Sequence, residues 1–209
     1  MKKVLMTLAL VAVAATSAFA QISVGAGYLA NTQKSSYTSG STTTTTATPL
    51  NGAYIGADYT IDMGQGLGLV AGLKGSFLTY THTTTLLGVS GTTNLKEFYL
   101  GVPVQCNYSY VLSNDLKLFA YAGPTFNIGL SSKSKFTQTV TDDVTITDNY
   151  GDGSDYGKFN ILLGAGVGVD VMNTIRIKAG YDIGLLDRDG RDDYKVNEAG
   201  WYVGVAYLF

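Results

Sequence analysis

The segment Thr174–Gly184, with the sequence TIRIKAGYDIG, alternates between apolar and polar side chains with a period of two. Ile175 and Ile177 fall on one side of this alternation, and Arg176 and Lys178 fall on the other. Because successive side chains of a β-strand point to opposite faces, the pattern predicts a strand with one apolar face and one charged face. A soluble sandwich would turn the apolar face inward, whereas a membrane barrel would turn it toward lipid. The rest of the chain decides between these two folds.

The amino terminus has the three-part pattern of a secretory signal peptide. Lys2 and Lys3 precede the apolar run Val4–Ala15, and the motif Ala-Phe-Ala follows, as expected for a cleavage site. We therefore expect residues 1–20 to be removed and residues 21–209 to form one mature domain. The apolar run is too short to span a membrane comfortably as a helix. The residues that define the predicted cleavage site are Ala18, Ala20 and Gln21.

The composition is unusual for a soluble domain. Charged residues make up 14% of the chain, below the roughly 25% of typical soluble domains. Without Lys2 and Lys3, 12 basic residues face 16 acidic ones, which gives a mature net charge of −4. A nucleic-acid partner is not expected, because phosphate binding requires a basic surface. Cys106 is the only cysteine, so no disulfide can form within the chain, and no apolar run after the signal reaches the length of a membrane helix.

Eight segments alternate in the manner of β-strands. The connections between them are in turn long and short: the short ones are residues 62–66, 111–115 and 172–173. Outer-membrane barrels have short periplasmic turns and long external loops. The sequence therefore predicts an all-β, eight-stranded, antiparallel up-and-down transmembrane β-barrel in the bacterial outer membrane, with both termini in the periplasm. The predicted strands are Ile22–Leu29, Ala53–Ile61, Leu67–Tyr80, Leu95–Tyr110, Leu116–Leu130, Phe159–Val171, Thr174–Leu185 and Gly200–Phe209.

On each predicted strand one face is apolar, and the other mixes charges, amides, glycine and tyrosine. Lysine or arginine on a lipid-facing surface would cost about 2–4 kcal/mol near the bilayer midplane, so the charged face is expected to line the lumen. Lys117, Asp170 and Arg176 lie on consecutive strands near the periplasmic end and are the best candidates for pairing. The predicted lumen charges are Asp58, Lys74, Glu97, Lys117, Asp170, Arg176, Lys178 and Asp182.

These lumen charges balance, with four of each sign. Because buried charges are stable only when paired, the balance favours an internal ion-pair network that closes the lumen. A selective pore would more typically carry a constriction of a single sign. Inward glycines are expected to make room for Tyr99, Tyr121 and Tyr202.

Aromatic residues on the apolar face gather near the two ends of the predicted strands. Such belts are typical of the two membrane interfaces. The predicted outer girdle comprises Phe77, Phe98, Phe126, Phe159 and Trp201, and the predicted periplasmic girdle comprises Tyr59, Tyr108, Tyr110, Tyr207 and Phe209.

Three stretches carry a resemblance to a known family. The segment LLGAGVGVDVMNTIRIKAGYDIGLLD (162–187), the motif YAGP (121–124) and the ending WYVGVAYLF (201–209) resemble the small outer-membrane β-barrel proteins of Bacteroidetes-type bacteria. These are often labelled porin-family or PorT-like, and are similar to the eight-stranded OmpA and OmpX barrels. The resemblance implies an outer-membrane location without an assigned activity. Tyr207 and the terminal Phe209 look like the signal read by the barrel assembly machinery.

Candidate sites for chemistry are few. His82 is the only histidine, and Ser90 and Glu97 are its nearest potential partners; this set would be needed for a lipid A-modifying barrel enzyme. Arg188 and Arg191 are potential phosphate contacts. The acidic segment between residues 142 and 155 resembles a calcium loop, but Phe159 stands where that loop needs glutamate. The acidic residues of this loop are Asp142, Asp143, Asp148, Asp152 and Asp155.

We therefore expect a structural or surface-interaction protein with a plugged lumen, no catalysis, no cofactor and no metal. The alternatives are a narrow porin-like channel for ions or small solutes, a lipid A-modifying enzyme, and a barrel associated with secretion machinery. The expected partners are outer-membrane lipid and lipopolysaccharide, with the barrel assembly machinery during insertion. The sequence does not identify the partner of the external loops.

Overall fold

The computed structural model describes residues 20–86, 89–138, 144–151, 154, 156–191 and 193–209. Residues 1–19 of the predicted signal peptide, with the cleavage-site residue Ala18, lie outside this part of the chain, and Ala20 is the first residue of β1. Within it, no helix is long and apolar enough to cross a membrane. The described residues form nine antiparallel strands: β1 (Ala20–Ser39), β2 (Thr42–Gly64), β3 (Leu67–Leu86), β4 (Val89–Ser113), β5 (Leu116–Gln138), β6 (Val144–Asp148), β7 (Phe159–Val171), β8 (Ile175–Gly184) and β9 (Tyr194–Leu208).

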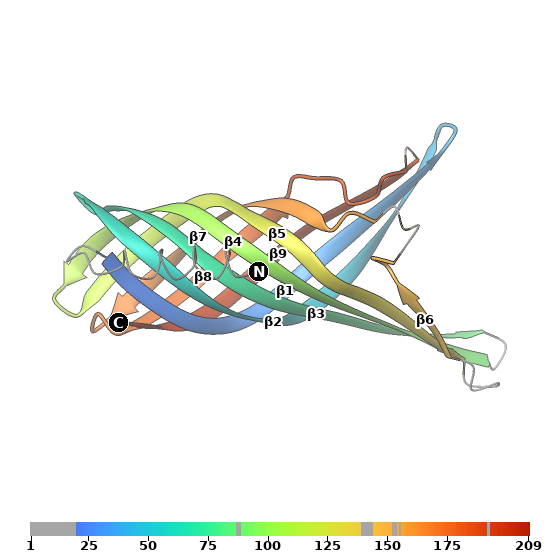
Figure 1. Cartoon of the computed structure of the whole chain (residues 1–209), viewed down its shortest axis with the longest axis horizontal. Coiled ribbons are helices and arrows are strands. Elements are labelled where there is room, and N and C mark those ends of the chain that lie inside the picture. Colours follow the sequence, from blue (N-terminus) through green and yellow to red (C-terminus); the bar gives the residue numbers. More distant parts are fainter. Residues whose placement is uncertain (1–19, 87–88, 139–143, 152–153, 155, 192) are drawn as a thin grey trace, which may run out of the picture.

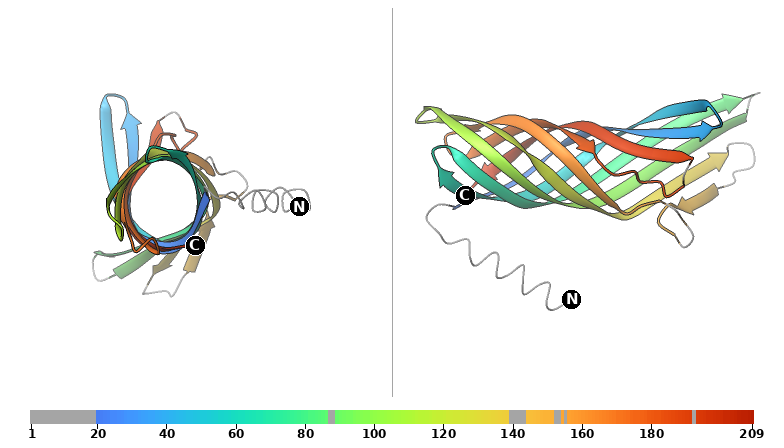
Figure 2. Two further views of the ribbon diagram at one scale, coloured as in Figure 1. Left: turned by 90° about the vertical axis from the view of Figure 1, so that its left-hand side faces the viewer. Right: turned by 90° about the horizontal axis from the view of Figure 1, so that it is seen from above.

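Eight of these strands close into a ring. The sheet runs in the order β4-β3-β2-β1-β9-β8-β7-β5-β6, and a further pairing of β4 with β5 completes the cylinder, which is seen end-on in Figure 2. The prediction of an eight-stranded up-and-down barrel is confirmed. The ninth strand, β6, lies outside the ring, where it pairs with residues 133–137 of β5; the sequence analysis had placed it in a loop.

The strands of the ring are strongly staggered. Following directly paired residues from Ile61 of β2 around the cylinder leads through Cys106 and Tyr181 and returns to β2 at Asn51, ten residues away. A stagger of this size over eight strands corresponds to a strand tilt of about 40° and to an interior that side chains can fill. Because the ring has no free edge within its wall, the backbone groups there pair without water.

The turns at one end of the barrel are tight. Met172 and Asn173 both have positive φ angles, of 53° and 50°, the backbone required at the two central positions of a type I′ hairpin. Gly64, Gln65 and Gly66 also have positive φ angles in the turn between β2 and β3. Since short turns face the periplasm in this class of barrel, β1 begins and β9 ends on the periplasmic side.

The long connections at the other end are mostly β-structure, so the predicted strand boundaries there are wrong. The tract Thr42–Thr46, which the sequence analysis placed in a loop, belongs to β2, and Ser39 pairs directly with Thr42. Cross-strand hydroxyl pairs hold this hairpin, such as Ser36 with Thr45 at 2.9 Å. Threonine favours strands, but with both faces in water the hairpin shows no apolar alternation. Because the apolar alternation is missing, the amino-acid sequence did not indicate that β1 and β2 continue to residues 39 and 42.

The extended strands leave the barrel as two separate sheets. Pairing of β2 with β3 stops at Asn51 and Thr79, whereas β1–β2 and β3–β4 remain paired almost to their tips. Beyond this point, β9, β1 and β2 form what we call the first wing, and β3, β4, β5 and β6 form the second wing. Figure 1 shows the two groups diverging. A strand needs only about 9–11 residues to cross the bilayer, and β4 has 25.

The outer face of the barrel is a band of apolar side chains. On β7 it includes Leu163 and Val167, which are 49% and 62% exposed. The 13 residues of β7, tilted as above, span about 33 Å, enough to cover the hydrocarbon layer. No Asp, Glu, Lys or Arg occupies an outward position of this band in the described strands. The charge-free face must therefore contact lipid.

Substitution of Val167 by lysine is expected to lower the free energy of unfolding by about 2–4 kcal/mol, because it places a charge on the lipid face near the middle of β7. Equilibrium unfolding in urea, with the protein inserted in phospholipid vesicles, measures this loss. The matched control is Thr44→Lys in the water-exposed hairpin, with an expected change within about 0.5 kcal/mol. Equal effects of the two substitutions would contradict the assignment of the faces.

Candidate functional site

The candidate site is the lumen, whose inward charges lie in pairs. Nearest the periplasm, Asp170 accepts two hydrogen bonds from Arg176, at 2.7 and 2.9 Å. The Nζ atom of Lys117 lies 3.3 Å from the same carboxylate. Arg176 also stacks on the ring of Phe119, 4.5 Å from its centroid. Asp170 is thus bound to both of the bases that the sequence analysis placed near it.

Two more ion pairs cross the middle of the lumen. Lys178 of β8 lies 2.8 Å from Asp58 of β2, and Lys74 of β3 lies 3.6 Å from Asp182 of β8. These strands are not neighbours in the sheet, so the pairs bridge the interior. Lys74 also lies over the rings of Tyr54 and Tyr202. Charge and aromatic surface together fill this level of the barrel.

Inward tyrosines occupy the space that inward glycines leave open. A side chain at Gly166 or Gly180 would collide with the phenol of Tyr121, whose hydroxyl donates a hydrogen bond to the carbonyl of Ala179 at 3.2 Å. Tyr202 occupies the space beside Gly180 in the same way. The glycines therefore leave room for each ring against the neighbouring strand, since Gly166 pairs with Tyr121 and Gly180 pairs with Tyr202.

Little open volume remains in the lumen. A cavity of about 30 Å³ lies beside Asp58, Lys74 and Lys178, and a second of about 10 Å³ lies between Phe119 and Arg176. Because about 10–15 Å³ of such space is enough for one water molecule, these cavities hold at most a few isolated waters. Two larger volumes lie at the mouths of the barrel, about 480 Å³ on the periplasmic side and about 430 Å³ on the outer side.

An apolar layer closes the lumen above the central ion pairs. Leu29, Leu50 and Leu78 point inward and are 4%, 1% and 2% exposed, and they belong to one buried cluster with Tyr54 and Tyr99. Sequence reasoning missed this layer because it treated the inward face as uniformly polar. The leucines separate the central ion pairs from the outer mouth.

A second polar cluster, centred on Arg188, covers the outer mouth. Arg188 comes from the connection between β8 and β9, yet it is only 1% exposed. Its guanidinium donates hydrogen bonds to the hydroxyls of Tyr99 and Tyr150, both at 2.8 Å, and to Glu198 at 3.2 Å. Its planar group also lies 4.4 Å from the ring centroid of Tyr156. We call Arg188 and these four partners the outer plug.

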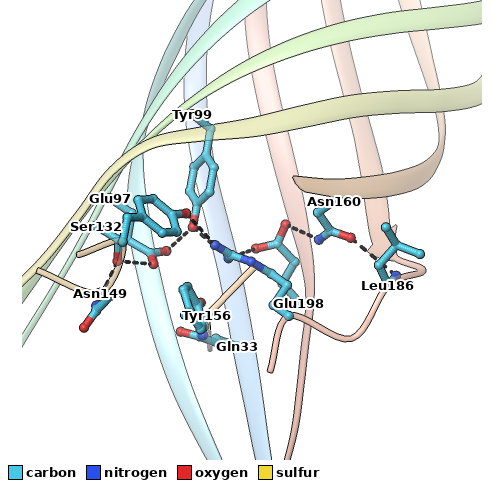
Figure 3. A network of polar contacts seen from close by, with 11 residues as sticks. Gln33, Glu97, Tyr99, Ser132, Asn149, Tyr156, Asn160, Leu186 and Glu198 are labelled. Atoms are coloured by element: carbon cyan, nitrogen blue, oxygen red, sulfur yellow. Dashed lines mark hydrogen bonds and ion pairs between the residues drawn. The ribbon is translucent and has the colours of Figure 1, made fainter. Parts of the chain in front are cut away.

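The contacts of the plug reach five strands and two connections, as Figure 3 shows. Glu97 of β4 accepts hydrogen bonds from Tyr99 and, at 2.9 Å, from Ser132 of β5. On the other side, Glu198 of β9 accepts from Asn160 of β7 at 2.9 Å. Gln33 of β1 donates to the hydroxyl of Tyr156 at 2.6 Å. These contacts tie the connections at residues 149–158 and 185–193 to the barrel wall.

The phenols of the outer plug remain neutral. Burial raises the pKa of Tyr150 and of Tyr156, while the nearby Arg188 acts in the opposite direction without reversing the shift. Both hydroxyls therefore keep their protons at neutral pH and serve as hydrogen-bonding groups.

The prediction that Arg188 is a phosphate contact at the surface is wrong. Its place in a charged loop suggested a surface phosphate contact, whereas it is buried and paired with Glu198. Glu198 was missed altogether because it falls in a segment read as a loop. Arg191 remains at the surface, with its side chain 52% exposed, and pairs with Asp189 at 2.6 Å. Val196, Glu198 and Gly200 stand at every second position and share the buried face. This spacing was a signal that could have extended the predicted last strand toward residue 196.

The structure does not bring His82 together with its predicted partners. His82 is exposed, lies opposite Thr93 and stacks on Tyr80. Glu97 is buried in the plug, and Ser90 lies near the tip of the hairpin, opposite Thr85. No catalytic set forms from these three residues.

The acidic loop also offers no metal site among the described residues, where no group of three suitable ligands occurs. Asp148 accepts a hydrogen bond from the backbone of Tyr150 at 3.0 Å. The remaining acidic residues of this loop, Asp142, Asp143, Asp152 and Asp155, lie outside the described residues.

The predicted girdle residues lie on the outward face of the barrel. Phe77 and Phe98 are directly opposed on neighbouring strands, and Trp201 packs against Tyr181 with 4.6 Å between ring centroids. At the other end, Tyr207 packs against Phe209 at 4.8 Å. The other predicted members are Phe126 and Phe159 toward the wings and Tyr59, Tyr108 and Tyr110 toward the short turns.

The fold and the lipid-facing band agree with a comparison to protein families. The family model for the outer membrane protein β-barrel domain matches residues 14–190, which is most of the chain. The protein therefore belongs to this family and is an integral protein of the bacterial outer membrane. No curated protein matches the sequence.

Solved structures of outer-membrane barrels are similar at low identity. Ail, the attachment invasion locus protein of Yersinia pestis, solved in complex with the heparin analogue sucrose octasulfate, is 15% identical; the match covers 91% of this chain and 99% of that chain, with a TM-score of 0.45. Neisserial surface protein A is 14% identical, with 92% and 98% coverage and a TM-score of 0.44. The outer membrane protease OmpT of Escherichia coli is 11% identical, with 92% and 96% coverage and a TM-score of 0.38.

Substitution of Arg188 by methionine is expected to lower the free energy of unfolding by about 3–5 kcal/mol, because Glu198 would be left buried without its counter-charge. Urea-induced unfolding in detergent or lipid measures this loss. Arg191→Met, at the exposed ion pair, is the control, with an expected loss of about 1 kcal/mol or less. The double variant Arg188→Met/Glu198→Leu should recover part of the loss; no difference between it and Arg188→Met would contradict the pairing.

Proposed function

We propose that the protein is a surface-exposed structural or interaction barrel with a closed, charge-balanced lumen. The single observation that carries this proposal is the filling of the lumen. Ion pairs, tyrosines, a leucine layer and the outer plug follow one another along the barrel axis. The cavities between them have volumes of about 30 Å³ or less. A pore that conducts hydrated ions needs a continuous aqueous path. The two wings, which project far beyond the membrane, are the parts available to partners.

The charge distribution also supports a closed lumen. Each buried carboxylate of the lumen, among the described residues, has a basic or hydrogen-bonding partner on another strand. Such buried pairs resist separation, because breaking one leaves an uncompensated charge in a medium of low dielectric constant. A narrow porin-like channel would instead favour unpaired side chains of one sign at its constriction.

The purified mature protein is expected to produce no steady single-channel currents in planar lipid bilayers. The triple variant Tyr54→Ala/Tyr121→Ala/Tyr202→Ala removes the rings that fill the centre but leaves the leucine layer and the outer plug, so it is expected to produce no steady currents either. Tyr28→Ala, on the lipid-facing side, is the matched control and should behave as the unaltered protein does. Ion-sized steady currents from the unaltered protein would overturn the proposal.

We also propose that the protein has no enzymatic activity. The separation of His82 from Glu97 supports this, since a general base must lie within hydrogen-bond reach of the group that it activates. His82→Ala is expected to leave the lipid A profile of producing cells unchanged, as measured by mass spectrometry, with Thr93→Ala as the control. A change confined to His82→Ala would restore the hypothesis of a lipid A-modifying enzyme.

The proposed partners follow from the location. Lipopolysaccharide and phospholipid surround the apolar band, and the barrel assembly machinery is proposed to recognise the end of β9, where Tyr207 and Phe209 project outward. Within the family, we propose a place among the small barrels of Bacteroidetes-type bacteria, on the basis of the sequence resemblance alone.

A further inference from the structure

Three lysines gather on the outward face of the second wing. Lys96 of β4 lies directly opposite Lys133 of β5, and Lys135 lies two residues further along β5. Side chains at these strand positions share one face, and all three lysines are exposed. Directly opposed residues have Cβ atoms about 5 Å apart, and diagonal neighbours about 7–8 Å. The three lysine side chains therefore start from Cβ atoms that are about 5–8 Å apart.

Negative charge near this arrangement is sparse among the described residues. None of the three lysines forms an ion pair there. Asp148 of β6 lies directly opposite Lys133 and supplies one negative charge against three positive ones; its carboxylate also accepts the backbone N–H of Tyr150. Like charges placed directly opposite each other destabilise a sheet. A cluster with surplus positive charge, in a chain with a net negative charge, is expected to bind an anionic group.

The lysines stand at a definite height relative to the membrane. Lys96 is two residues, about 7 Å along the strand, from Phe98, the last outward apolar residue of β4. On β5 the apolar band ends at Leu130, and Lys133 is the first charged residue beyond it. The cluster therefore lies just outside the hydrocarbon, at the level of lipid headgroups in the outer leaflet.

Further hydrogen-bond donors flank the lysines. Thr79 of β3 lies opposite Lys96, and Asn94 of β4 lies opposite Lys135. The amide of Asn94 donates to the hydroxyl of Thr81 at 2.9 Å, which leaves that hydroxyl's proton directed away from the amide. A phosphate group in this place would meet several cations together with neutral donors, the combination that binds phosphate strongly.

We propose that Lys96, Lys133 and Lys135 form a binding site for the phosphate groups of lipid A in the outer leaflet. The phosphates neutralise the opposed lysines, and the acyl chains lie along the apolar band next to Phe98 and Leu130. The site deepens the proposed surface role by naming one partner and where it binds. It does not depend on the state of the lumen, so the conductance measurement and the lipid-binding measurement can fail independently.

The test is native mass spectrometry of the detergent-solubilised mature barrel with bisphosphorylated lipid A as the probe. Each lysine near a charged membrane surface contributes about fivefold in affinity, so the Lys96→Ala/Lys133→Ala/Lys135→Ala variant is expected to weaken binding by about a hundredfold. The corresponding triple arginine variant keeps the charges and should retain binding within about threefold. Heat-modifiable migration on a gel verifies that each variant is folded.

A matched control comes from the first wing. Lys34 of β1 and Lys195 of β9 are also exposed and outward, but Lys34 is four residues from Ala30, which pairs with Trp201 at the edge of the apolar band. Lys34→Ala/Lys195→Ala therefore removes two charges placed further from the headgroups. It is expected to change lipid A binding by less than about threefold.

Two further probes identify the source of the phosphate. Dephosphorylated lipid A with the same acyl chains should lose most of its affinity, and inorganic phosphate at millimolar concentration should not displace the lipid. Unchanged binding by the triple alanine variant, or by the dephosphorylated lipid, would overturn the proposal. Displacement by inorganic phosphate would assign a free-anion site and would overturn it as well.

Discussion

The structure depends on one constraint: inside a bilayer, polar groups have no water to bind. Backbone groups can satisfy this requirement with strands only if the sheet closes, and β4 closes it by pairing with β5. Closure of eight strands with a stagger of ten residues sets the radius of the cylinder, and that radius admits side chains rather than a water column. The alternation along each strand then places apolar groups against lipid and polar groups within the lumen.

The same constraint governs the lumen. Asp170, buried between Arg176 and Lys117, is stable because its charge is shared with two bases. Arg188 and Glu198 repeat this solution at the outer mouth, where neutral tyrosines complete the hydrogen bonds. Between them, Leu29, Leu50 and Leu78 add buried apolar surface on three neighbouring strands. Transport of hydrated solutes would require a continuous aqueous path, which these filled layers interrupt. A filled lumen is instead consistent with the proposed role of the barrel as a rigid support for the external sheets.

The wings are subject to a different constraint. Outside the bilayer, water can hydrate both faces of a sheet, and alternation with a period of two is no longer required. Threonine and serine replace the apolar residues, and cross-strand hydroxyl pairs such as Thr83 with Thr92 support the hairpins. Where the wing meets the membrane, the first outward charges are the lysines at 96 and 133, and their like sign distinguishes this level from the paired lumen.

The fold class, the membrane-spanning parts of the eight ring strands and the lipid-facing side of each strand could be read from the amino-acid sequence. These features follow from periodicity, which is local, and from the cost of charge in lipid. The tertiary structure alone decided which residues meet across the barrel. Lys178 and Asp58 are 120 positions apart, and their contact depends on the stagger of the ring. Likewise, Arg188 became a buried plug residue only because two connections fold back over the mouth, a long-range arrangement that no local pattern in the sequence encodes.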